Sequence, residues 1–316
     1  MVEKINISVI VIAHNCSEHV ERCMTSLLKQ PGITLDIVII NDGSDDDTLK
    51  KLESYADKYK FIHLFDQKHK GPANSLNKSL KQLKGEYTLF MFPDYELMPF
   101  SLQLVYKEAA RTNADITMFP IIRGNSKNRI PALNAPVSGR DLINRFMKMH
   151  EQILFDCRSF LIKTDFLEEE NIRFDHRMTK VYSFDFFSRL LISCTDIMTS
   201  RVPCVICKDD RFPIEIQTES ESNQLAAELE YLKKNIVAFD EQKHLTAMEH
   251  KAMTIIYDMF MLQLYESGCL KGLPQKAGRE YMDSAMKYLQ RSGLITLMRN
   301  IATFRKLKKE LKQISE

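Results

Sequence analysis

Apolar runs alternate with helical patterns over the first third of the chain. Residues 7–12 and 35–40 are nearly continuous apolar runs, which are typical of strands covered on both faces of a sheet. Between them, apolar residues recur at helical spacing after Ser17, the expected N-cap. Residues 61–65 and 87–92 predict two further strands, each preceded by a helical stretch.

This alternation with short connections predicts an α/β fold. The favoured arrangement is a doubly wound, mainly parallel sheet with helices on both faces. The carboxyl ends of parallel strands meet at one edge, which is where open α/β sheets bind ligands. Asp42 follows the second strand and Asp94 follows the fourth, so we expect both carboxylates at that edge.

The segment Asn41-Asp42-Gly43-Ser44, with Asp46 and Thr48 beyond it, is the most informative motif. A carboxylate directly after a buried strand is well placed to hold a nucleotide. Asp, Gly and Ser also favour turns and helix N-caps for local reasons, so a structural role is the alternative.

A string of motifs resembles the family-2 glycosyltransferases of the GT-A fold. The likeness rests on the order and spacing of the motifs and covers about residues 5–212. The motifs are Asn15 at the end of the first strand, Asn41 to Thr48, the Gly71 loop with Asn77, Gly85-x-Tyr87, Asp94, Leu97-x-Pro99, and a helix with Asp185 after Phe174-Asp175.

The resemblance implies an enzyme of cell-surface polysaccharide biosynthesis. It would move a sugar from a nucleotide-diphosphate sugar to a hydroxyl of a glycan, polymer or lipid-linked acceptor, with inversion. Asp94 and Glu96 would hold a divalent cation, Mn²⁺ or Mg²⁺, on the diphosphate, and Asp185 would be the general base. The implied nucleotide-binding residues are Ala13, His14, Asn15, Asp42, Gly43, Ser44, Gly71 and Asn77.

The catalytic half departs from the family's pattern at several positions. Phe92 and Tyr95 stand where the metal motif is commonly acidic, Leu76 replaces an Arg of the Gly71 loop, and Phe184 replaces an acidic neighbour of the base. A second hypothesis is therefore a catalytically degenerate domain that binds or scaffolds beside an active partner subunit. Nucleotidyl transfer is disfavoured because residues 13–16 lack a Gly-rich, basic phosphate loop.

Composition narrows the class of protein. The 316 residues carry a net charge of +2, which argues against a protein whose main partner is nucleic acid. Seven cysteines without a framework spacing suggest reduced thiols, and we expect a cytoplasmic protein without a signal peptide. Residues 204–207, Cys-Val-Ile-Cys, predict a strand rather than a zinc site.

Helix formers dominate beyond Arg211-Phe212-Pro213, so we predict a GT-A-like domain over residues 1–212 and a helical C-terminal region over residues 213–316. The last segment, residues 294–314, is apolar on one side and basic on the others. It would either contact the inner face of an anionic membrane or pack on the preceding helices with its lysines solvated. A homo-oligomer also stays open.

Overall fold

The structure, a computed structural model, describes residues 4–124, 126–127, 130–149, 157–208, 218–243, 246–270, 273, 275–291 and 301–315. It divides into two compact units, one of Met1–Gly139 with Asp156–Asp210 and one of Arg140–Phe155 with Arg211–Glu316. The expected boundary at residues 211–213 lies outside the described residues. Residues 140–155, expected in the first domain, belong to the second unit.

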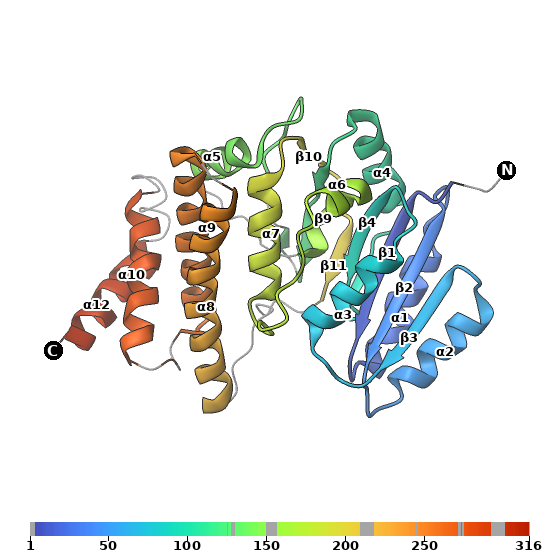
Figure 1. Cartoon of the computed structure of the whole chain (residues 1–316), viewed down its shortest axis with the longest axis horizontal. Coiled ribbons are helices and arrows are strands. Elements are labelled where there is room, and N and C mark those ends of the chain that lie inside the picture. The colour runs from blue at the N-terminus through green and yellow to red at the C-terminus, as the bar shows by residue number, and fades with distance from the viewer. Residues whose placement is uncertain are drawn as a thin grey trace. The chain divides into compact units, whose positions relative to one another are not determined.

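Seven strands form one sheet in the first unit (Figure 1), in the order β10-β6-β9-β4-β1-β2-β3. The pairs β4-β1, β1-β2 and β2-β3 are parallel, as is β10-β6, whereas β9 runs antiparallel to both β4 and β6. The expected α/β fold with a mainly parallel sheet is confirmed. The strands are β1 (Ile7–Ala13), β2 (Leu35–Asp42), β3 (Ile62–Gln67), β4 (Tyr87–Met91), β6 (Ile116–Met118), β9 (Phe160–Lys163) and β10 (Ile197–Thr199).

The strand order reverses next to β1. The chain proceeds from β1 to β2 and β3 on one side, and β4 then pairs with β1 on the other side. Every residue of β1 is buried, because both of its edges are paired and both of its faces are covered. The carboxyl ends of β1 and β4 therefore flank the switch point at which open α/β sheets bind ligands.

The helices of the first unit bury the faces that the sequence pattern predicts. Helix α1 buries Val20, Cys23, Met24 and Leu27. The prediction of Ser17 as N-cap is wrong, because α1 begins at Ser17 and its backbone N–H donates to Asp46, far along the chain. The helices are α1 (Ser17–Leu28), α2 (Thr48–Lys58), α3 (Pro72–Ser79), α4 (Ser101–Thr112), α6 (Thr164–Glu169) and α7 (Tyr182–Ser193), with 3-10 turns η1 (Leu80–Gln82) and η2 (Cys157–Ser159).

A second, four-stranded sheet has the order β5-β11-β7-β8. Its strands are β5 (Tyr95–Leu97), β7 (Ile121–Arg123), β8 (Ser126–Lys127) and β11 (Val205–Cys207). Val205–Cys207 form β11, which confirms the strand interpretation of this segment, and Cys204 and Cys207 are both buried. Burial raises the pKa of Cys204 to about 12, so its thiol stays protonated.

The second unit is helical, as the composition predicts. Its elements are α5 (Gly139–Met149), α8 (Glu219–Lys243), α9 (Ala247–Glu266), α10 (Gln275–Arg291) and α12 (Ile301–Ser315). Residues 294–300 of the expected last helix lie outside the described residues. In α12, Leu307 is buried and Lys306 lies 5.8 Å from the ring centre of Tyr265, while Arg305 and Lys309 are exposed. This arrangement favours packing on the neighbouring helices. None of the helices that the structure describes is long and apolar enough to cross a membrane.

We expect Gly85→Ala to lower the free energy of unfolding by about 1–3 kcal/mol, the usual cost of overpacking. A methyl group at Gly85 would overlap the backbone of Ile7 and Ser8 in the central strand. Urea denaturation followed by circular dichroism measures the change. The matched control is Gly278→Ala in α10, where the nearest atom would lie 3.6 Å away and Ala favours the helix. An equal loss in both variants would contradict the prediction.

Candidate functional site

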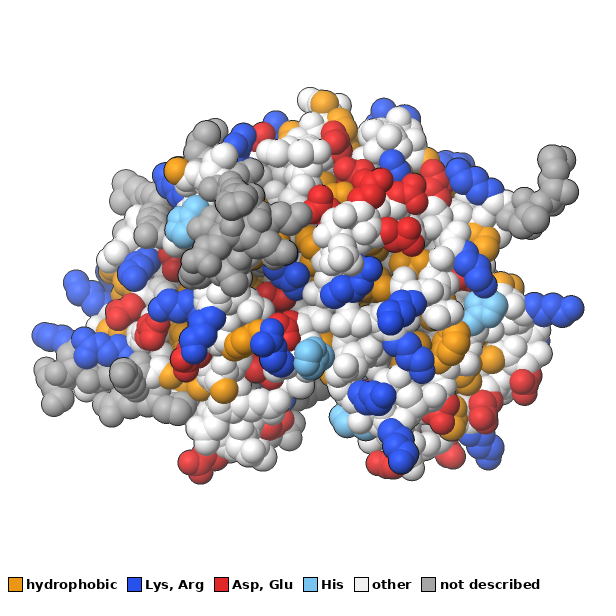
Figure 2. All heavy atoms as spheres, viewed as in Figure 1, with side chains coloured by type: hydrophobic (Ala, Val, Ile, Leu, Met, Phe, Trp, Pro, Cys, Tyr) orange, Lys and Arg blue, Asp and Glu red, His pale blue; other side chains and the backbone are white. Residues whose placement is uncertain are grey.

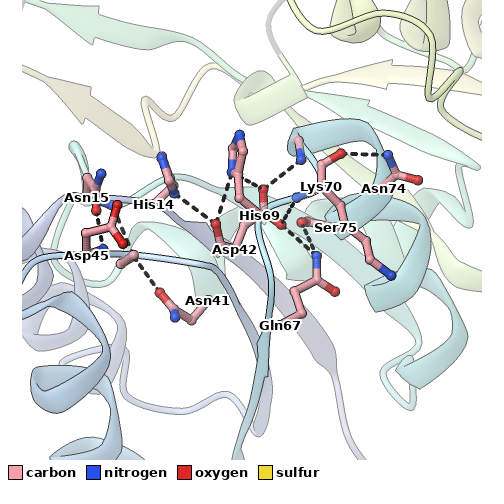
Figure 3. Close-up of polar contacts among 12 residues, drawn as sticks. His14, Asn15, Asn41, Asp42, Asp45, Gln67, His69, Lys70, Asn74 and Ser75 are labelled. Carbon is pink, nitrogen blue, oxygen red and sulfur yellow. Dashed lines mark hydrogen bonds and ion pairs between the residues drawn. The ribbon is translucent and has the colours of Figure 1, made fainter.

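The carboxylate of Asp42 is the centre of a hydrogen-bond network at the carboxyl edge of the sheet (Figure 3). Its Oδ1 accepts hydrogen bonds from Gln67 Nε2 at 2.7 Å and from the backbone N–H of Lys70 at 3.0 Å. Its Oδ2 accepts from the backbone N–H of Gly71 at 2.9 Å and lies 3.0 Å from His69 Nδ1. Burial opposes the charge, but these hydrogen bonds outweigh it and lower the pKa of Asp42.

Two imidazole rings stack beside this carboxylate. His14 Nδ1 lies 2.8 Å from the backbone oxygen of Asp42, and His69 Nδ1 lies 3.1 Å from the same oxygen. The ring centres are 4.3 Å apart, with 30° between the planes. Both side chains are exposed, so the pair presents an aromatic surface at the edge where a ligand would bind.

The loop after β1 is braced against the loop after β2. The backbone N–H of Asn15 donates to Ser44 Oγ at 3.1 Å, and Asn15 Oδ1 accepts from the N–H of Asp45 at 2.8 Å. Asn15 has φ 45°, a left-handed conformation that Asn tolerates better than most residues. The hydroxyl and backbone N–H of Thr48 lower the pKa of Asp46, whose carboxylate also accepts from Ser17.

Gly43 is required by its surroundings. It has φ 67°, and a Cβ atom there would lie 2.5 Å from the backbone nitrogen of His69. Any other residue would push the His69 loop away from the carboxyl edge, so Gly43 lets the loops after β2 and β3 approach closely.

The structure separates Asn77 from this network. Asn77 Nδ2 donates to the backbone oxygen of Phe174 at 2.7 Å, and its Oδ1 accepts from the N–H of Phe174 at 2.9 Å. The side chain thus ties α3 to the segment before α7. Of the expected nucleotide-binding residues, the structure brings together Ala13, His14, Asn15, Asp42, Gly43, Ser44 and Gly71.

Asp94 lies beside a buried arginine. Its Oδ2 is 3.8 Å from Nη1 of Arg158, a side chain that is only 9% exposed. The guanidinium carbon of Arg158 lies 3.7 Å from the ring centre of Tyr95 and 5.1 Å from that of Phe92. The expected metal position therefore carries a cation of the protein's own.

Glu96 has two basic partners. Its Oε1 lies 2.6 Å from Arg22 Nε and 3.1 Å from Lys208 Nζ. Among the described residues, no group of three or more His, Cys, Asp or Glu side chains is placed to hold a metal ion. Asp94 and Glu96 face separate cations, so in this structure they do not fit a divalent cation as a ligand pair.

Asp185 lies in the first turn of α7 and is 2% exposed. Its carboxylate forms an ion pair with Arg189, one turn along the helix. Arg189 Nη2 also donates to the backbone oxygen of Arg173 at 2.8 Å. The pair thus anchors the segment before α7, and an acceptor hydroxyl would reach Asp185 only after Arg189 moves.

The opposite edge of the sheet is acidic. Figure 2 shows Asp and Glu side chains gathered around α6, whose last residues, Glu168 and Glu169, are followed by Glu170. Helix α6 begins beside the start of β4, because the N–H of Thr164 donates to the backbone oxygen of Glu86. This negative charge disfavours an anionic ligand beside α6.

Several residues of this edge carry no signal in the sequence pattern. Gln67 pairs in register with Asp42 across β2 and β3, so strand pairing could have indicated it. His69 and Lys70 belong to a loop, and only the fold brings them to Asp42. Arg158 precedes β9, whose pairing with β4 the sequence does not predict.

The fold and this edge define an α/β protein whose candidate site is built from the loops after β1, β2, β3 and β4. The model of glycosyl transferase family 2 matches residues 8–191, more than half of the 316 residues, and the chain belongs to this family. The resemblance found in the sequence motifs is thereby confirmed.

Relatives of known sequence match part of the chain. A cholesterol galactosyltransferase of Borreliella burgdorferi is 30% identical over 153 residues, which are 46% of this chain and 43% of that protein. A chondroitin synthase of Escherichia coli is 26% identical over 175 residues, 54% of this chain and 26% of that protein. The matched part is thus less than half the length of either relative.

Solved structures share the fold. Residues 1–349 of S. aureus TarS superpose with a TM-score of 0.66 at 16% identity, covering 98% of this chain and 92% of that chain. A mannosyltransferase of Pyrobaculum calidifontis in complex with GDP-Man and Mn²⁺ has a TM-score of 0.55 at 14% identity, covering 99% and 85%. These likenesses confirm the GT-A-like fold and extend no further.

We expect Asp42→Ala to lower the free energy of unfolding by about 1–3 kcal/mol, because buried donors lose their acceptor. The folded pKa of Asp42 is lowered, so its contribution is complete above the unfolded value of about 3.9 and disappears as the pH falls through the folded value. Urea denaturation at neutral pH and below pH ~4 measures this. Asp47→Ala, at an exposed residue without a side-chain capping bond, is the control. If the difference in unfolding free energy between Asp42→Ala and wild type did not shrink in acid, the stabilising role of the charged Asp42 carboxylate would be contradicted.

Proposed function

We propose that this chain is a glycosyltransferase that moves a sugar from a nucleotide-diphosphate sugar to a hydroxyl of a glycan, polymer or lipid-linked acceptor. The observation that carries the proposal is the network around Asp42, which lies at the carboxyl edge and inside the residues matched by the family model. Solved structures of TarS in complex with UDP and with UDP-GlcNAc, and the GDP-Man complex of the mannosyltransferase, support a nucleotide-diphosphate donor.

The nucleoside would lie over the loops that Asp42 holds. Four partners of the Asp42 carboxylate, Gln67, His69, Lys70 and Gly71, belong to the segment 67–71, and the side chain of His69 is 58% exposed. Displacement of His69 would free Oδ2 to accept a hydrogen bond from the base or ribose. The aromatic face of His14 would then be available for stacking.

The transfer forms a bond between the acceptor oxygen and the anomeric carbon of the sugar. The bond from that carbon to the diphosphate breaks, its electron pair stays on the diphosphate, and the acceptor proton passes to a base. A single displacement inverts the anomeric carbon. Asp185 is the proposed base, in a role that requires its ion pair with Arg189 to open.

The divalent cation, Mn²⁺ or Mg²⁺, has weaker support. The Mn²⁺ in the mannosyltransferase complex favours it, and Asp94 is the carboxylate left for it at the end of β4. Arg158 beside Asp94, and Arg22 beside Glu96, count against it. We therefore route no step of the proposed reaction through a metal ion.

A catalytically degenerate binding or scaffolding subunit is the second candidate function. The buried ion pair of Asp185 favours it, because a base held by a guanidinium is a poor proton acceptor. The aromatic side chains of Phe92 and Phe184 at expected acidic positions point the same way. Such a subunit would bind the nucleotide and leave transfer to a partner.

The acceptor and the location extend the proposal. A cytoplasmic enzyme that contacts the inner face of the membrane would use the exposed Arg305, Lys308, Lys309 and Lys312 of α12. The relative named as a cholesterol galactosyltransferase supports a lipid acceptor, and the chondroitin synthase supports a polysaccharide.

Calorimetric titration with UDP, GDP, UDP-GlcNAc and GDP-Man tests the proposed function. We expect at least one to bind wild type, and Asp42→Ala to weaken that binding by about 10- to 100-fold, the equivalent of a lost hydrogen bond to a charged group. Asp47→Ala is the matched control in the neighbouring loop. Absence of binding by wild type to the whole panel would remove the proposal.

We expect Asp185→Asn to reduce the transfer rate by about 10²–10⁴-fold while donor affinity is kept, because the acceptor proton loses its base. Arg189→Gln breaks the same ion pair but keeps the carboxylate. A general base predicts that transfer persists in Arg189→Gln, whereas a purely structural pair predicts equal loss in both variants. Nucleotide binding by wild type without transfer from any donor would establish the degenerate subunit instead.

A further inference from the structure

Aromatic rings occupy the positions at which the metal motif of the resemblance is commonly acidic. Phe92 and Tyr95 both turn a ring face toward one guanidinium, that of Arg158, whose carbon lies 5.1 Å and 3.7 Å from the two ring centres. Contacts of this kind attract a cation to the ring face. Phe92 and Tyr95 therefore remove possible carboxylate ligands of a metal ion and also bind the fixed positive charge of Arg158.

The sheet brings this charge to the switch point. Strand β9 runs antiparallel to β4 with Leu89 opposite Leu161, and the 3-10 turn η2 before β9 holds Arg158 against Phe92, which follows β4. Strand β1 pairs in parallel with β4, with Val11 opposite Met91, so the carboxyl ends of the two strands lie side by side. Arg158 contacts Phe92, directly after β4, and therefore lies at this common end.

We infer that the Arg158 guanidinium, in place of a divalent cation, carries the positive charge that faces the diphosphate of the donor. The inference rests on the proposed function, which supplies the diphosphate. An arginine keeps its charge at every physiological pH and presents paired N–H donors that match two phosphate oxygens. As the bond to the anomeric carbon breaks, these donors stabilise the electron pair that stays on the diphosphate.

Three other positions of the resemblance are less suited than Arg158 to supply or hold this charge. A divalent ion on Asp94 would stand next to the guanidinium, which is 9% exposed and cannot turn away into solvent. Leu76, at the position of an arginine in the resemblance, is 1% exposed and brings no charge. Glu96 is already paired with Arg22 and Lys208. The cation beside Asp94 is Arg158.

The first test uses the wild-type chain of 316 residues and needs no variant. Calorimetric titration with UDP and GDP is carried out in EDTA and again with Mn²⁺. We expect the bound nucleotide to keep its affinity within about threefold in EDTA. Binding that requires Mn²⁺ overturns the inference and leaves the proposed function standing. Failure to bind in both buffers removes the proposed function, and the inference with it.

The second test separates the diphosphate from the nucleoside. We expect Arg158→Met to weaken nucleoside diphosphate binding in EDTA by about 10- to 100-fold, with the free nucleoside affected much less. Arg158→Lys keeps the charge but loses the paired donors, so its affinity for the nucleoside diphosphate should lie between those of wild type and Arg158→Met. Mn²⁺ should recover part of the affinity in Arg158→Met, because Asp94 no longer faces a cation.

The control for net charge is Arg111→Met, at an exposed residue in the last turn of α4. Thermal unfolding of each variant identifies loss of the fold, since Arg158 is buried on two rings. Unchanged diphosphate affinity in a folded Arg158→Met protein, or equal losses for nucleoside and diphosphate, would overturn the inference.

Discussion

The buried carboxylate of Asp42 is the interaction on which the carboxyl edge of the sheet depends. Burial by itself favours the neutral acid, and the charge persists because Gln67, Lys70 and Gly71 donate hydrogen bonds to it. These donors are the last residue of β3 and two residues of the loop after it, so one charge joins the ends of β2 and β3 to the start of α3. The loops therefore take a conformation that supplies hydrogen-bond donors to this buried carboxylate.

The other carboxylates of the expected catalytic machinery are balanced in a different way, by arginine. Each faces a guanidinium: Asp94 with Arg158, Glu96 with Arg22 and Asp185 with Arg189. Asp42 thus accepts hydrogen bonds from neutral donors, which a ligand can replace. The other three carboxylates form ion pairs, which a ligand must open or use as they are. This difference explains why the nucleotide half of the edge matches the resemblance more closely than the catalytic half.

Family membership establishes the scaffold and leaves the chemistry to the site. The matched residues 8–191 include the loops after β1, β2, β3 and β4, and also α7 with Asp185. Within this shared scaffold, Phe92 and Tyr95 hold the guanidinium of Arg158 at positions where the resemblance leads us to expect acidic side chains. A small number of side chains can therefore alter the electrostatic mechanism without altering the fold.

The sequence by itself determined the first four strands, the helices between them and the common edge of Asp42 and Asp94, because side-chain periodicity and parallel connections are local properties. Only the tertiary structure decided the antiparallel insertion of β9 between β4 and β6, and the capping of α1 by Asp46. The tertiary structure also decided the hydrogen-bond and ion-pair partners of each carboxylate. A side chain's partners depend on which strand or loop lies beside it, and that neighbour is chosen by the packing of the whole sheet, which leaves no periodic trace in the chain.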